Sequence, residues 1–482
     1  MKLIGREQEV KELNRLYNSD SPQFVAVYGR RRVGKTFLID ETFKGRITFR
    51  HAGLSPVDHA RGANLLKSQL KNFYYSLTTQ GMKKSKCPTS WLEAFFMLEQ
   101  HLKSMDDGSR QLIFLDELPW MDTPRSGFIT ALEAFWNGWA CHRDNVMLVV
   151  CGSASSWIQN SLINNHGGLY GRLTYEIKLS PFTLRECEAF YRSRGVKLSQ
   201  YEITRGYMVL GGVPYYLGYI EPSQSMVQNV DRLFFSKGAP LRGEFDRLFA
   251  SVFARPVEVK SIVKALSERH AGYTRSEIAK KTGIQQGGGL SKMLEALIVS
   301  DFIQAYVPFG HSKRAVHYKL IDPFCLFYLR HVSNQNRSEG FWQQNQSSPS
   351  VLSWQGIAFE DICLMHIDQI KKALNIYGVS SRQSSWALPG NDGTDGTDGT
   401  QIDMLIERDD NVVNLCEMKF YKNDFAVDKA YDRTLRNRLA LLQQHLPKRV
   451  AVHMTLITTF GLTYNEYFGA FQQVITLDDL FV

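Results

Sequence analysis

Residues 24–36 read FVAVYGRRRVGKT, an apolar run of strand length followed by a loop with a glycine near each end. The loop matches the spacing GxxxxGK[ST], and residues 37–43 (FLIDETF) read as the start of a helix. Such glycines let backbone N–H groups wrap a phosphate, and the helix N-terminus adds a positive dipole. The stretch predicts a phosphate-binding loop, in which Lys35 reaches the β- and γ-phosphates and Thr36 ligates Mg²⁺. The predicted nucleotide contacts in this loop are Gly29, Arg30, Arg31, Arg32, Val33, Gly34, Lys35 and Thr36.

A second apolar run, at residues 111–116, ends in two acids, Asp116 and Glu117. An apolar strand that ends in this way after a phosphate-binding loop places its first acid beside the Mg²⁺ ion. The second acid then polarises the attacking water. We therefore expect Asp116 to be a metal ligand and Glu117 to be the catalytic acid, so that the nucleotide is hydrolysed as well as bound.

The pattern around these motifs indicates an α/β fold. Up to about residue 235, apolar runs such as 24–29, 111–116 and 146–152 alternate with amphipathic segments. Continuous apolar runs of strand length are typical of a parallel sheet that is buried on both faces, with helices between the strands. At 482 residues the chain is long enough for about two or three cores.

The composition of the chain excludes fewer functions than its motifs do. The net charge of +9 permits contact with nucleic acid but does not establish it. Seven cysteines without a CxxC pair favour buried thiols in a reducing compartment over a zinc site or disulfides. The first residues lack a signal peptide, and no apolar run reaches the roughly 18 residues of a membrane span. We expect a cytoplasmic protein without membrane contact.

The motifs together resemble those of a known family. Ile4-Gly5-Arg6-Glu7, the glycine loop and Leu115-Asp116-Glu117 look like the AAA+-type ATPases of the archaeal ATPase group, relatives of the STAND NTPases. The resemblance covers about residues 1–235 and implies ATP as the nucleotide, with Mg²⁺. It also implies that Gly211-Gly212-Val213-Pro214 belongs to a helical lid, although these residues also fit a simple turn between helices.

The same resemblance suggests further site residues. It implies that Ile4 and Arg6 lie against the adenine and that Ser153 occupies the sensor-1 position. It implies that Arg172 touches the γ-phosphate, either in its own subunit or across a subunit boundary. The alternative for Arg172 is an ordinary solvated charge.

The middle of the chain reads as three short helices, at 257–270, 274–282 and 288–300, followed by an alternating stretch at 302–320. This order resembles a winged helix-turn-helix, in which 288–300 is the recognition helix and the basic wing tip at 311–314 touches phosphates. The helix at 288–300 holds only one basic residue and one acid, which is unusual for a reader of base edges. A structural or nonspecific role for this segment therefore stays open.

Charged residues also stand inside apolar strand-like runs near the C-terminus. Asp403 lies in one run, Glu417 and Lys419 lie in the next, and the polar turn between the runs predicts an antiparallel hairpin. Glu417 and Lys419 are two residues apart and so share a strand face. Glu360 lies on a predicted helix in the sequence GIAFE. Charges in such runs are costly to bury unless they are paired or bind a metal.

These four residues together resemble the PD-(D/E)xK nuclease fold, over about residues 350–482. The resemblance implies that Asp403 and Glu417 bind Mg²⁺, that Lys419 activates the attacking water, and that Glu360 helps to hold the metal or the water. A degenerate domain that does not cut is the alternative. The repeat NDGTDGTDGT at 391–400 reads as a mobile loop that could alter access to the cleft.

We therefore expect an AAA+-like P-loop ATPase with a helical lid at 1–238, a winged helix at 239–335, and a restriction-endonuclease-like α/β domain at 350–482, after a polar linker at 333–350. The expected function is ATP hydrolysis coupled to binding of nucleic acid, most simply DNA, and to its cleavage. The alternative is a nucleotide switch in signalling, in which both C-terminal units serve only as interaction modules. A homo-oligomer, or a protein partner held by the winged helix, fits either expectation.

Overall fold

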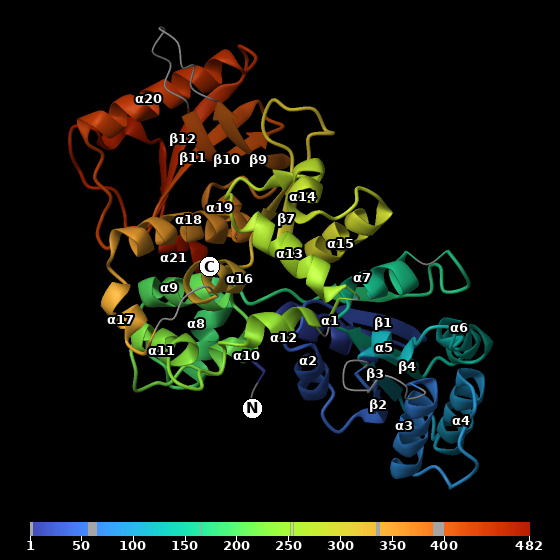
Figure 1. Cartoon of the computed structure of the whole chain (residues 1–482). Helices are drawn as coiled ribbons and strands as arrows, with labels where there is room; N and C mark the ends of the chain where they lie inside the picture. The colour runs from blue at the N-terminus through green and yellow to red at the C-terminus, as the bar shows by residue number, and fades with distance from the viewer. Residues whose placement is uncertain are drawn as a thin grey trace. The chain divides into compact units, whose positions relative to one another are not determined.

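The computed structural model describes residues 3–55, 65–164, 166–250, 252–253, 255–333, 338–388 and 400–482 (Figure 1). The chain divides into two compact units. Unit 1 consists of Met1–Pro181, Asp246–Val259 and Ser291–Asp301, and unit 2 consists of Phe182–Phe245, Lys260–Leu290 and Phe302–Val482. This division differs from the three predicted units, because the residues expected to form the lid of the ATPase group with the C-terminal half of the chain.

Unit 1 is built around a five-stranded sheet in the order β2-β3-β4-β1-β5, and every neighbouring pair is parallel. The strands are β1 (Gln23–Tyr28), β2 (Ile47–Ala52), β3 (Gln111–Asp116), β4 (Val146–Gly152) and β5 (Tyr175–Lys178). Every residue of β1, β3 and β4 is buried, as expected for strands covered on both faces. The predicted parallel α/β sheet is confirmed.

Helices cover the two faces of this sheet with two separate apolar cores. One core joins alternate residues of β1, β3 and β4 to α1 (Glu7–Tyr17) and α2 (Lys35–Thr42). The other core joins the remaining strand residues to α3 (Leu65–Thr79), α4 (Trp91–Ser104) and α6 (Phe128–Gly138). Because the strands are parallel, the loops that follow β1, β3 and β4 all leave the same edge of the sheet.

One part of unit 2 is helical. Its helices are α8 (Leu184–Ser193), α9 (Gln200–Leu210), α10 (Pro214–Leu217), α11 (Met226–Phe234), α16 (Pro323–Phe327) and α17 (Phe341–Asn345). Between α9 and α10, Gly211 and Gly212 both have a φ of +65°. A Cβ atom on Gly212 would lie 2.3 Å from the carbonyl oxygen of Phe182, so the close approach of the two backbones requires glycine there.

The prediction of a linker at residues 333–350 is wrong for its second half, which contains α17. The Asp231 carboxylate accepts hydrogen bonds from the backbone N–H groups of Gly340, at 2.6 Å, and Trp342, at 2.8 Å. Trp342 is 2% exposed and its ring packs 5.0 Å from that of Phe327. A buried tryptophan and a capping carboxylate from another helix give this polar stretch a fixed structure, and neither contact is visible in the local composition.

The middle segment has the element order helix, strand, helix, helix, strand, strand. The elements are α13 (Pro256–Leu266), β6 (Tyr273–Thr274), α14 (Arg275–Thr282), α15 (Gly288–Val299), β7 (Ile303–Tyr306) and β8 (His317–Leu320). The strands form an antiparallel sheet in the order β6-β8-β7. From Ser291 onward α15 belongs to unit 1, where Val299 joins an apolar core of the five-stranded sheet.

The last part of unit 2 is a sheet in the order β13-β12-β11-β10-β9. Its strands are β9 (Ser381–Leu388), β10 (Thr400–Arg408), β11 (Val412–Lys419), β12 (Ala451–Thr458) and β13 (Gln473–Ile475). The predicted hairpin is confirmed, because β10 and β11 pair antiparallel. α18 (Pro349–Met365) and α20 (Lys429–Gln444) lie on opposite sides of this sheet (Figure 1). The repeat at 391–399 lies outside the described residues.

None of the helices in the described ranges combines the length and the apolar character that a bilayer crossing requires.

Candidate functional site

The loop after β1 closes around the side chain of Lys35. Its ammonium group donates hydrogen bonds to the carbonyl oxygens of Gly29 and Arg30, both at 2.9 Å, and lies 3.4 Å from the hydroxyl of Ser153. Gly34 has a φ of +93° and directly precedes α2, so a left-handed residue turns the chain into the helix. The loop thus holds a buried cation beside the N-terminus of a helix, and both features favour binding of an anion.

The end of β3 meets this loop at its threonine. The Thr36 hydroxyl donates a hydrogen bond of 2.8 Å to the Asp116 carboxylate, which is 7% exposed. A hydroxyl and a carboxylate oxygen this close together are the hard ligands that Mg²⁺ prefers, so the residues present fit the predicted ion. Burial raises the pKa of the neighbouring Cys151 thiol, and the negative charge of Asp116 raises it further. That thiol therefore stays protonated at neutral pH.

Glu117 turns back toward the end of β4. Its backbone is left-handed, at φ 47° and ψ 47°, which is uncommon for a residue with a side chain. Its carboxylate accepts hydrogen bonds from the hydroxyl of Ser153, at 2.5 Å, and from the backbone N–H of Ser153, at 3.1 Å. The structure brings Lys35, Thr36, Asp116, Glu117 and Ser153 into one cluster at the carboxyl edge of the sheet.

The other nucleotide-contact candidates differ in how far they are buried. Arg30 and Val33 are buried, whereas Arg31 and Arg32 are half-buried. Ile4 is half-buried, and Arg6 is buried with a left-handed backbone at φ 65°. The Arg6 guanidinium donates a hydrogen bond of 2.5 Å to the carbonyl oxygen of Ser180.

Sequence reasoning missed Leu179, which supports the start of the loop. A Cβ atom on Gly29 would lie 2.1 Å from the Leu179 carbonyl oxygen, and the Leu179 N–H donates to Tyr28 at 2.7 Å. Both contacts are made by backbone atoms. The identity of Leu179 carries no signal for them, so the sequence alone could not reveal this support.

Arg172 lies away from the cluster in its own chain. It is exposed, and it precedes Thr174, whose N–H donates to the Phe24 carbonyl near the start of β1. The phosphate-binding loop follows the other end of β1, roughly 13 Å away at about 3.3 Å per residue. A role of Arg172 at the γ-phosphate, in its own subunit or across a subunit boundary, stays a prediction.

Two of the C-terminal candidates share one face of their strand. Glu417 is 3% exposed, and its carboxylate accepts a hydrogen bond of 2.7 Å from the Tyr431 hydroxyl and pairs with Arg438. The Lys419 ammonium lies 4.0 Å from the Glu417 carboxylate. Tyr431 and Arg438 both come from α20, so the side chains of Glu417 and Lys419 face that helix.

Glu360 is on α18, the helix that covers the opposite side of the sheet. Its carboxylate lies 3.5 Å from Nδ1 of His270. The next residue, Asp361, is 1% exposed and pairs with Lys319 at 2.7 Å. Burial by itself raises the pKa of Asp361, but Lys319 and His270 outweigh it and hold the pKa below the ordinary value. The sequence singled out Glu360, whereas Asp361 is the more deeply buried acid.

Asp403 lies in β10, next to Met404. Met404 pairs with Cys416 of β11, and Cys416 directly precedes Glu417. The side chain of Asp403 lies outside the described residues. Among the side chains that the structure describes, no group of three His, Cys, Asp or Glu residues could hold a metal ion. The predicted C-terminal metal site therefore stays a prediction.

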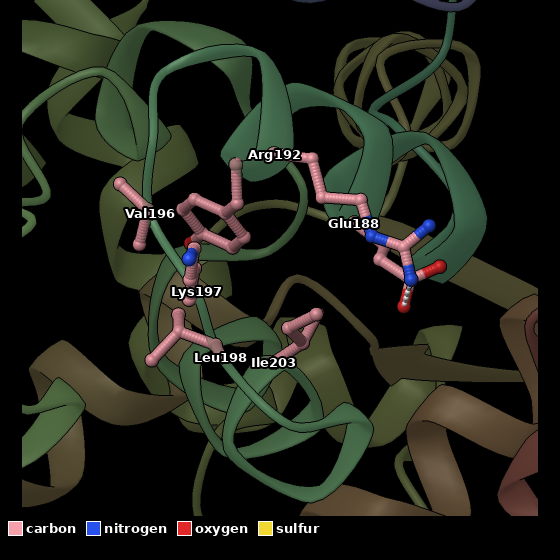
Figure 2. Close-up of a pocket in the computed structure, with 7 residues that line it drawn as sticks. Glu188, Arg192, Val196, Lys197, Leu198 and Ile203 are labelled. Carbon is pink, nitrogen blue, oxygen red and sulfur yellow. Dashed lines mark hydrogen bonds and ion pairs between the residues drawn. The ribbon is translucent and has the colours of Figure 1, made fainter.

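A separate pocket of about 310 Å³ lies between α8 and α9 (Figure 2). Val196, Leu198 and Ile203 line it, and Glu188 and Arg192 form an ion pair of 2.8 Å at its side. None of the predicted site residues contributes to this pocket, which is therefore distinct from the cluster at the phosphate-binding loop.

Residues 3–220 match a family model described as an ATPase domain predominantly from Archaea. An uncharacterized protein of Methanocaldococcus jannaschii is 24% identical over 377 residues, which are 77% of this chain and 78% of that protein. A Walker-type ATPase of Pyrococcus abyssi is similar in structure, with a TM-score of 0.44 and 20% identity, over 68% of this chain and 96% of that one. The ORC2 protein of Aeropyrum pernix has a TM-score of 0.40 and 12% identity, over 72% and 96%. The family match, the parallel sheet and the phosphate-binding loop together support an archaeal-type ATPase domain within residues 3–220.

Proposed function

We propose that this domain binds MgATP at the loop 29–36 and hydrolyses it with Glu117 as the general base. The observation that carries the proposal is the single cluster in which Thr36 meets Asp116 and Ser153 meets both Glu117 and Lys35. Thr36 and Asp116 would hold the Mg²⁺ ion, which neutralises charge on the phosphates. Ser153 holds the Glu117 carboxylate through two donors, so that the general base has a defined direction.

Each residue of the cluster has a separate task. Lys35 exchanges the carbonyl oxygens of Gly29 and Arg30 for oxygens of the terminal phosphates. Glu117 accepts a proton from the attacking water, and Ser153 keeps its carboxylate at the end of β4. These tasks rely on positioning and on electrostatic stabilisation, which supply most of the catalysis in phosphoryl transfer.

Lys35→Ala tests the binding half of this proposal. The Lys35 ammonium is the cation that the loop buries, so its loss should abolish tight MgATP binding while circular dichroism shows an intact fold. Binding is measured by titration with a fluorescent ATP analogue. Wild-type affinity in a folded Lys35→Ala protein would rule out the assignment of the loop.

We further propose that ATP hydrolysis is coupled to nucleic acid, most simply DNA. Three features support this coupling: the net charge of +9, the element order of residues 256–320, and the exposed basic loop with His311, Lys313 and Arg314 between β7 and β8. Basic side chains on such a loop neutralise phosphates, and binding through them weakens as salt rises. DNA should bind at low salt and should raise the ATPase rate several-fold. If the protein binds no nucleic acid at 50 mM salt, the signalling-switch alternative replaces this proposal.

Metal-dependent cleavage by the C-terminal domain is a second candidate activity. It is supported by Glu417 and Lys419 on one strand face and by Asp403 in the adjacent strand. The Glu417 carboxylate already has Arg438 and Tyr431 as partners, so the described side chains do not by themselves fit a metal ion, and we derive no step through one. Cleavage of mixed DNA substrates with Mg²⁺ or Mn²⁺ tests this activity. Cleavage should be lost in Glu417→Gln and Lys419→Ala, and wild-type cleavage in both variants would exclude this site.

A further inference from the structure

An acid far along the chain holds the segment that supports the phosphate-binding loop. The Asp301 carboxylate pairs with the Lys178 ammonium at 2.5 Å and accepts a hydrogen bond of 3.0 Å from the Ser180 hydroxyl. Each of the two carboxylate oxygens contacts one of these partners. Lys178 and Ser180 stand on either side of Leu179 in the sequence. Asp301 therefore clamps the chain on both sides of Leu179, at the exit of β5.

The clamped segment touches the nucleotide site at three points. The Leu179 N–H donates to the Tyr28 carbonyl, and the Leu179 carbonyl lies against Gly29, the first residue of the loop. The next carbonyl, of Ser180, accepts the hydrogen bond from Arg6. A shift of residues 178–180 would therefore move the start of the loop and release Arg6, because interiors packed at this distance cannot absorb a shift locally.

Asp301 itself is fixed by the fold of unit 1. It lies two residues after the end of α15, has a left-handed backbone at φ 58°, and donates its N–H to the Ile298 carbonyl at 3.0 Å. Val299, two residues earlier, is part of the apolar core beside the sheet. The Asp301 side chain is 23% exposed, so its two bonds are partly protected from water. The end of α15 therefore holds Asp301 in place for its contacts with Lys178 and Ser180.

We propose that Asp301 is a positioning residue for nucleotide binding, acting through Ser180 and Leu179 on Gly29. The proposal rests on the proposed MgATP site at residues 29–36. Asp301 contacts no atom that reacts, so it stabilises the bound nucleotide and the transition state equally. Its loss therefore raises KM and leaves kcat unchanged. Asp301 is also the last residue of unit 1 before the chain enters β7, the strand that precedes the basic loop.

The test compares Asp301→Ala with a matched acid at the other edge of the same sheet. Asp106 also bridges two partners, Arg143 and Asn145, just before the start of β4. Asp301→Ala should raise the Kd and KM for MgATP about fivefold or more, with kcat within about twofold of wild type. Asp106→Ala should leave all three values unchanged, because the amino-terminal edge of β4 does not support the loop.

Two milder variants keep the test decisive if Asp301→Ala does not fold. Asp301→Asn retains an acceptor for Ser180 and loses the ion pair, so its Kd should fall between those of wild type and Asp301→Ala. Ser180→Ala removes the hydroxyl and should also raise the Kd. Wild-type Kd and KM in the folded variants of Asp301 and Ser180 would overturn the proposal, as would an equal loss in Asp106→Ala. Failure of the MgATP site itself would instead appear as unchanged binding in Lys35→Ala.

Discussion

Glu117 combines a left-handed backbone with a carboxylate whose two oxygens are both held by Ser153. A non-glycine residue in this conformation costs about 1 kcal/mol, so the surrounding contacts must fix it. The direction of the carboxylate is therefore set before ATP arrives. A base aligned in this way needs little rearrangement to accept a proton from water, and its negative charge is essential for that step.

At the residue scale we predict that Glu117→Gln retains MgATP binding and loses hydrolysis by about 100-fold or more, the usual range for removal of a general base. The amide keeps the size of the side chain and an acceptor for Ser153 but lacks the charge that takes the proton. Single-turnover hydrolysis and a binding titration on the same sample separate the two effects. Ser153→Ala, which keeps the base and loosens it, should show a smaller loss. A Glu117→Gln protein that hydrolyses ATP at the wild-type rate would place the general base elsewhere.

At the element scale, His366 joins two helices of unit 2. It lies between α18 and α19 (Ile367–Ala373), and its Nε2 accepts the N–H of Leu184, the first residue of α8, at 3.0 Å. Its Nδ1 lies 2.8 Å from the Ile362 carbonyl, so the neutral ring donates there. Burial lowers the pKa of His366 to about 4 from 6.5. The contact between His366 and the start of α8, called the joint below, therefore requires the uncharged imidazole.

We predict that this joint weakens in mild acid. The folded pKa lies below the unfolded pKa, so the unfolded chain binds more protons between pH 6.5 and 4, and stability falls as the pH drops through that range. At pH 5 the loss amounts to about 2 kcal/mol relative to neutral pH. Urea unfolding at pH 7 and pH 5 measures the loss, and His366→Gln, which cannot titrate, should show a smaller change. Equal pH dependence in both proteins would contradict the role of His366.

At the scale of the whole molecule, the position of Arg172 bears on assembly. It stands at the amino-terminal edge of its sheet, whereas the phosphate-binding loop stands at the carboxyl edge. This separation favours contact with the γ-phosphate of a second copy of the chain over contact with the γ-phosphate bound by the same chain. Mixing Arg172→Ala with Lys35→Ala protein should then restore ATPase activity, because mixed interfaces combine an intact loop with an intact arginine. Lys11→Ala serves as the exposed-cation control. Full activity of Arg172→Ala alone would remove the residue from the site.

The accuracy of sequence-based prediction varied with the distance between interacting residues. The strand and helix around Gly29 and Lys35 were predicted correctly, and so was the hairpin of β10 and β11, because glycine spacing and polar turns act on neighbouring residues. α17 was missed, because Asp231, more than 100 residues earlier in the chain, caps it. The predicted helix that carries Glu360 is α18, and it ends before His366, whose ring accepts a hydrogen bond from the first residue of α8.

The sequence by itself determined the chemistry of the nucleotide loop and the parallel sheet that carries it. Both follow from local backbone freedom and from apolar runs that must be buried on two faces. Only the tertiary structure decided which partners the acids meet: Glu117 meets Ser153, Glu417 meets Arg438, and Asp301 meets Lys178 and Ser180. These partners are separated by 21 to 123 residues of chain. Their meeting depends on how whole elements pack, and no residue type or spacing encodes that packing locally.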